Sequence, residues 1–195
     1  MITRRTGGAL LCVLLPLAAC TEDASSREQR PPAAVTSSAT TPSATTAAPT
    51  LEESASRSAT AVLEEMLRVT DAAKKAPAAK DWEPEIRRYA GDPAAFLAVT
   101  SVRDYATLGL RQEGDTAVEL DVTAVELEAS EGPTVRITGC YDAASTRVVK
   151  VETGEVVPPG TPPRYVWDIT VTQYEAEPNS PWLVSVLDPL TTRPC

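Results

Sequence analysis

The pattern of apolar and polar positions changes once along the chain, and its first part predicts helices. Between Thr50 and Pro77, apolar side chains recur every three or four positions, which places them on one face of a helix. Thr50 and Glu53 have capping-box spacing at the start of this helix, and Pro77 ends it. The apolar stripe consists of Ala55, Ala59, Val62, Leu63, Met66, Val69 and Ala73.

Two shorter helices are predicted next. The first begins with Asp81 as its N-cap and stops at Gly91. The second begins at Asp92-Pro93, which supply its cap and its first residue. The apolar positions of these helices are Trp82, Ile86 and Tyr89 in the first, and Ala94, Phe96, Leu97 and Val102 in the second.

After Tyr105 the apolar period falls to two, which is typical of half-buried strands. Val118, Leu120 and Val122 alternate with polar residues, whereas Val125 and Leu127 continue one residue out of phase. This shift predicts a β-bulge near Thr123-Ala124. Further strands are predicted over residues 134–141, 147–151, 164–174 and 182–187, and residues 153–163 are predicted to be a long connection.

Helices followed by neighbouring strands predict an α+β domain over residues 51–195, with the N-terminal helices packed on one face of a curved antiparallel sheet. This order, the bulged strand and the final Pro-Trp-Leu-Val-Ser-Val strand at 181–186 resemble the NTF2-like cone fold. The sequence is similar in particular to small exported lipoproteins and membrane-anchored proteins of high-GC Gram-positive (actinobacterial-type) bacteria that carry this domain.

The N-terminus has the features of a secretory signal. Arg4 and Arg5 precede an apolar run over residues 9–17, and this run is too short for a membrane span. Leu17-Ala18-Ala19-Cys20 resembles a bacterial lipobox, and Leu17 is unsuited to ordinary signal peptidase, which prefers a small residue there. We therefore expect residues 1–19 to be a lipoprotein signal peptide and Cys20 to be the lipidated first residue of the mature chain.

Residues 20–50 are predicted to be a disordered tether. From Thr21 to Thr50, 23 of the 30 residues are Ser, Thr, Ala or Pro, and none is aromatic, so the segment cannot bury enough apolar surface to order itself. Such a composition also suits an O-glycosylated stalk, with a plain spacer as the alternative.

Removal of Arg4 and Arg5 with the signal peptide leaves 16 of the 18 basic residues against 27 acidic residues. This acidic chain is unsuited to nucleic acid and to anionic headgroups, so the predicted membrane contact is the lipid.

Histidine is absent from the whole sequence, which excludes Ser-His-Asp and Cys-His catalytic arrangements and histidine-ligated metals. With Cys12 in the signal and Cys20 lipidated, Cys140 and Cys195 remain, and an even pair in an exported protein favours a disulfide. By the strand alternation, Cys140 is expected on the outer face of the sheet. Two free thiols are the alternative.

The carboxylates give little indication of catalysis. Enzymes of the NTF2-like group that resemble ketosteroid isomerases or polyketide cyclases place a carboxylate or tyrosine inside the cone. Here the strand carboxylates fall out of phase with their apolar neighbours, which predicts an outward orientation for Glu119, Asp121, Glu126, Glu128 and Asp168. No catalytic residue, cofactor or metal ligand is therefore assigned.

The aromatic residues are the remaining candidates for an apolar pocket. Tyr141, Tyr165 and Trp167 share the predicted inner face of the sheet, and Trp82, Phe96 and Tyr105 could face them from the helices. An ordinary aromatic core is the alternative to a pocket.

We expect a lipid-anchored protein on the extracytoplasmic face of the cell membrane. Its domain is expected to have no catalytic role and to bind another envelope protein or a small apolar ligand. An accessory role in an envelope complex is a further candidate. The alternative is a cofactor-independent isomerase or cyclase-like enzyme with an apolar substrate in the cone. An enclosed cavity with an inward polar group would favour the enzyme.

Overall fold

The computed structural model describes residues 48–195; the predicted signal peptide, the lipidation site Cys20 and nearly all of the predicted tether lie outside the described residues. Three helices come first: α1 (Leu51–Lys75), α2 (Glu83–Ile86) and α3 (Ala94–Thr107). Seven strands follow: β1 (Leu110–Glu113), β2 (Ala117–Glu126), β3 (Thr134–Asp142), β4 (Arg147–Lys150), β5 (Val156–Val157), β6 (Arg164–Gln173) and β7 (Trp182–Leu190). This order confirms the predicted α+β class.

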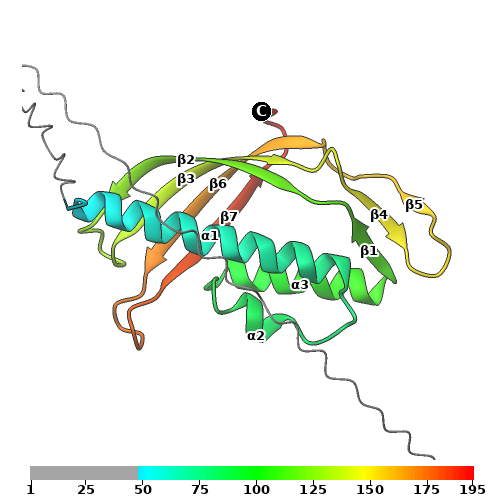
Figure 1. Cartoon of the computed structure of the whole chain (residues 1–195), viewed down its shortest axis with the longest axis horizontal. Coiled ribbons are helices and arrows are strands. Elements are labelled where there is room, and N and C mark those ends of the chain that lie inside the picture. The colour runs from blue at the N-terminus through cyan, green and yellow to red at the C-terminus, as the bar shows by residue number, and fades with distance from the viewer. Residues whose placement is uncertain (1–47) are drawn as a thin grey trace, which may run out of the picture. The chain divides into compact units, whose positions relative to one another are not determined.

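A curved antiparallel sheet of strand order β2-β3-β6-β7 carries the helices on one face, as predicted (Figure 1). The register shift between Val122 and Ala124 confirms the predicted bulge. The described residues form no closed barrel, because β2 and β7 are the two ends of the sheet.

The first helix packs on the sheet through its predicted stripe. Its capping box is present: the Thr50 side chain accepts from the Glu53 amide, and the Glu53 carboxylate accepts from the Thr50 amide. Of the predicted stripe only Val62 is half-buried; the buried members are Ala55, Ala59, Leu63, Met66, Val69 and Ala73. They meet the inner face of the sheet, where the largest buried side chains include Val135, Ile137, Val171 and Val184.

A second, smaller sheet of order β1-β4-β5 was not predicted. Residues 147–151 were expected to extend the main sheet, but β4 pairs with β1 and β5 instead. The chain turns into β2 at Gly114, whose φ is +86°, and a Cβ atom there would lie 2.2 Å from the Ser145 carbonyl oxygen. Glycine is therefore required where the two sheets separate.

The outer face of the main sheet is covered at one end by the C-terminal tail. Cys140 is bonded to Cys195, so the predicted disulfide is present in the structure. Next to it, the Val166 amide donates to the Arg193 carbonyl oxygen at 2.9 Å. Val166 is consequently buried although it points outward.

Candidate functional site

Three of the predicted pocket residues meet on the inner face of the sheet. Tyr141 of β3 and Tyr165 of β6 are directly opposite in the register, and their ring centroids are 5.3 Å apart. Trp167 stacks on Tyr141 with centroids 4.4 Å apart. Tyr165 and Trp167 are buried, with exposed fractions of 8% and 9%. The strands therefore present a continuous aromatic cluster to the helices.

Tyr105 of α3 and Lys74 of α1 lie on the helical side of this cluster. The Lys74 ammonium is 5.9 Å from the centroid of the Tyr105 ring. Burial lowers the pKa of Lys74 and raises the pKa of Tyr105. The pKa of Tyr141 is also raised, by burial first and by the neighbouring phenols second. At neutral pH both phenols are uncharged.

Little space is left inside the cone. A cavity of about 20 Å³ lies against Trp167, Tyr141 and Lys74, which is room for about one water molecule. The indole Nε1 of Trp167 is buried and has no hydrogen-bond partner among residues 48–195. Beside Trp167 the described residues are therefore closely packed around the aromatic cluster.

Two predicted pocket residues lie elsewhere. Trp82 packs at the start of α2, where its Nε1 donates to the Ala76 carbonyl oxygen at 3.0 Å and Lys80 covers its ring at 4.1 Å. Phe96 is 60% exposed, so its predicted inward position is wrong. Residues 94–99 are all apolar, so the periodicity does not define a buried face there. The small side chains of α3 are the ones that pack inward: Ala94, Ala95, Ala98, Val99 and Val102.

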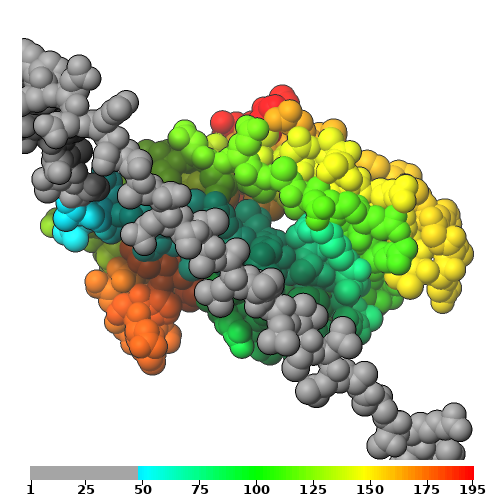
Figure 2. Space-filling model, viewed as in Figure 1, coloured from blue at the N-terminus to red at the C-terminus, as the bar shows by residue number. Residues whose placement is uncertain are grey.

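A larger depression lies between α1 and β2. It is a groove of about 650 Å³, floored by Leu67 of α1 and by Val118 and Leu120 of β2. Polar residues of α1 line its other wall, from Thr60 to Lys75. The space-filling view is hollowed between the teal surface of α1 and the green surface of β2 (Figure 2). An apolar floor with a polar wall is suited to a bound ligand or to a segment of another chain.

Asp71 closes one end of the groove with a hydrogen-bond network. Its carboxylate accepts from the amide of Gln112 and from the Thr116 hydroxyl at 3.1 Å, and it pairs with the Lys75 ammonium at 2.6 Å. Lys75 also pairs with Asp115. Burial opposes ionisation of Asp71, but the hydrogen bonds from Lys75, Thr116 and Gln112 outweigh it and hold its pKa below the usual value. The network fixes the end of α1 to the β1–β2 connection.

We expect Asp71→Ala to lower the free energy of unfolding by about 1 to 3 kcal/mol, because Gln112, only 5% exposed, loses the acceptor for its amide. Chemical denaturation at pH 7 measures this loss. Asp115→Ala is the control, because the Asp115 side chain is 88% exposed and its ion pair contributes little. An equal loss in both variants would contradict a structural role for the Asp71 network.

The same carboxylate gives the stability a pH dependence. Its pKa is lower in the folded protein than in the unfolded chain, where it is about 3.9. The stabilisation is therefore complete above about pH 4 and is lost as the pH falls toward the folded pKa, because the unfolded chain takes up its proton first. Denaturation curves measured at several pH values in this range should show that the free energy of unfolding falls more steeply with decreasing pH in the wild type than in Asp71→Ala.

The predicted outward carboxylates are all exposed: Glu119, Asp121, Glu126, Glu128 and Asp168. Within residues 48–195, no group of three or more Asp, Glu, Cys or His side chains is placed to hold a metal ion. Asp71, which lines the groove, and Gln112, which donates to it, were not identified from the sequence. Their only signal is a polar residue on α1 and a glutamine in a short strand, and neither indicates a contact across 41 positions.

No protein-family model matches the sequence, and no curated protein matches it. Among solved structures, the chain is similar to the intermembrane space region of the chloroplast protein ARC6. The two are 16% identical and superpose with a TM-score of 0.47, over 69% of this chain and 95% of that chain.

Proposed function

We propose that this chain is a membrane-anchored extracytoplasmic lipoprotein whose domain has no catalytic role and binds another envelope protein through the groove between α1 and β2. The observation that carries the proposal is the contrast between two spaces. The interior beside Trp167 has about 20 Å³, whereas the surface groove has about 650 Å³ and an apolar floor. The first space is too small for a substrate, and the size and apolar floor of the second support the binding of a protein segment.

The charge distribution supports an attachment by lipid. The Leu17 to Cys20 motif supplies an acylation site, and the mature chain is strongly acidic. An acidic domain is repelled by anionic headgroups. Two or more acyl chains anchor a protein stably in the membrane, whereas a single chain does not. Within residues 48–195, none of the helices has the length and apolar composition needed to cross a bilayer.

Cys20→Ser is expected to abolish acylation, so that the protein is retained as an uncleaved precursor or shed. The measurement is the distribution of the protein between membrane and soluble fractions, together with its intact mass. Cys12→Ser is the matched control, because Cys12 lies within the predicted signal and its loss leaves Cys20 intact. A Cys20→Ser protein that is still processed and stays with the membranes would show that the anchor is not this lipid.

The binding function is tested by filling the groove without removing a core side chain. Thr60 lines the groove, so Thr60→Trp should block it, whereas Ser58 is exposed on α1 outside the groove and Ser58→Trp should not. We expect a partner protein to co-purify in mild detergent with the wild type and with Ser58→Trp, and to be lost with Thr60→Trp. Equal recovery with the two tryptophan variants would place the binding surface elsewhere.

A further inference from the structure

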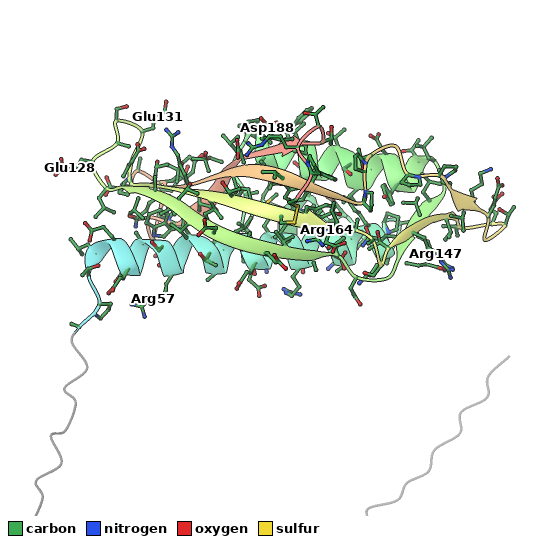
Figure 3. The ribbon with its side chains drawn as sticks, turned by 90° about the horizontal axis from the view of Figure 1, so that it is seen from above. Arg57, Glu128, Glu131, Arg147, Arg164 and Asp188 are labelled. Atoms are coloured by element: carbon green, nitrogen blue, oxygen red, sulfur yellow. A yellow bond between two sulfur atoms is a disulfide. The ribbon has the colours of Figure 1, made fainter. Side chains whose placement is uncertain are left out.

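The two edges of the main sheet differ in what covers them. At the β7 edge, the α2–α3 connection adds a short bridge: the Gly91 amide donates to the Val184 carbonyl oxygen at 3.0 Å, and the Val184 amide donates to the Tyr89 carbonyl oxygen at 2.9 Å. At the other edge, β2 pairs with β3 alone among the described strands. Seen from above, β2 runs as the edge strand alongside α1 (Figure 3).

The hydrogen-bond alternation fixes which backbone groups of β2 point away from the sheet. The Gln173 amide donates to the Pro133 carbonyl oxygen, one step beyond the register pair Thr134–Thr172. Residues 133 and 173 are therefore a hydrogen-bonded pair. Because bonded and non-bonded pairs alternate in antiparallel strands, the odd-numbered residues of β3 direct their backbone groups to β6, and the even-numbered residues direct theirs to β2.

On β2, this register turns the backbone groups of Glu119 and Asp121 toward β3. The intervening residues direct their N–H and C=O groups to the open edge instead. These residues are Val118, Leu120 and Val122. An edge strand with such unpaired groups is a template for one more strand.

The side chains of β2 restrict which strand can pair there. Val118 and Leu120 face the groove, so an added strand would place alternate side chains on the same apolar floor. Glu119 and Asp121 point to the outer face, are exposed, and have no ion-pair partner among the described residues. Glu126, beyond the bulge, already pairs with Arg136. Across the groove, Glu64 of α1 adds another unpaired carboxylate within the described part of the chain.

We propose that the partner contributes an extended segment, in which apolar side chains alternate with lysine or arginine, as a fifth antiparallel strand on the free edge of β2 over residues 117–122. The inference rests on the proposed binding function and specifies its mode. The main chain of β2 supplies the hydrogen bonds, the groove takes the apolar side chains, and Glu119 and Asp121 pair with the basic ones.

Charge favours such a partner over a second copy of this chain. Two β2 edges paired with each other would bring the carboxylates of Glu119 and Asp121 against those of the other copy, and like charges on adjacent strands are destabilising. The bulge after Val122 ends the regular edge, so the added strand is limited to the first six residues of β2.

The test uses the full chain in mild detergent and a synthetic peptide of alternating lysine and valine with blocked ends. Backbone hydrogen exchange is measured by NMR with and without the peptide. We expect exchange to slow at the amides of Val118, Leu120 and Val122, and to stay unchanged at Glu119 and Asp121, which already bond to β3. A peptide N-methylated at every valine should not bind, because valine amides are the ones that face β2 in this register.

The double variant Glu119→Lys with Asp121→Lys should bind the peptide about tenfold more weakly or worse, because two attractive cross-strand pairs become repulsive. The control is Asp168→Lys with Asp188→Lys, which changes the net charge equally on the same outer face but away from the edge. This control should bind like the wild type. A glutamate-valine peptide should not bind.

Four results would overturn the inference. They are amides at 118, 120 and 122 that are already protected in the free chain, dimerisation through β2, equal binding of the N-methylated peptide, and equal weakening by both double variants. If any of these occurs while Thr60→Trp still abolishes co-purification, the strand mode alone is wrong. If co-purification is also unaffected by Thr60→Trp, the proposed groove function fails as well.

Discussion

Replacing Trp167 with alanine is expected to lower the free energy of unfolding by about 3 to 5 kcal/mol. The indole is 9% exposed and stacks on Tyr141 at 4.4 Å, so the substitution removes a large buried side chain and an aromatic pair. The neighbouring cavity is only about 20 Å³, so loss of the indole opens a much larger space beside it. Urea denaturation at neutral pH measures the loss.

Phe96→Ala is the matched control for this experiment. Phe96 is 60% exposed on α3, and substitutions at such positions change stability by about 0.5 kcal/mol or less. Apolar compounds should leave the melting temperature of the wild type unchanged. A saturable stabilisation of the wild type by such a compound, removed by Trp167→Ala, would show that the cone is a ligand pocket and would favour the enzyme alternative.

Loss of the disulfide has the second large effect. Cys140 and Cys195 are 55 residues apart in the sequence, and a loop of that length corresponds to about 4 kcal/mol in the chain-entropy model. Cys195→Ser should therefore lower the melting temperature of the oxidised protein without abolishing the fold, since a domain has about 5 to 15 kcal/mol of stability. It should also expose Val166, which the tail covers through the Arg193 carbonyl.

Reduction provides the control for the disulfide. A reducing agent should lower the melting temperature of the wild type to that of Cys195→Ser and leave the variant unchanged. Two titratable thiols in the denatured, unreduced protein would show that the bond is not formed.

The parts of the fold that the sequence predicted are long and strongly periodic. The stripe on α1 continues through five turns, and the alternation on β6 brings Tyr165, Trp167 and Ile169 to one buried face. The bulge was visible as a change of phase between Val122 and Val125. In each case one face is buried, so a shift of register would expose apolar side chains.

The parts that were missed depend on contacts rather than on period. Four-residue β1 and two-residue β5 are too short to show alternation, and they form a sheet because β4 lies between them. Phe96 lies in a helix segment that is apolar on all sides, so its outward position follows from alanine packing. At one end of the groove, Asp71 of α1 accepts from Gln112 of β1 and from Thr116 just before β2, and no local pattern predicts that junction.

Photo-crosslinking from Thr60 in native membranes tests the central claim most directly, because it reports on what occupies the groove between α1 and β2. A photoreactive residue at position 60 is expected to crosslink to one envelope protein, and the same residue at position 58 is expected to give no such product. The label should map to a segment of that protein where apolar and basic residues alternate. No protein product at position 60, or the same product from both positions, would contradict the account.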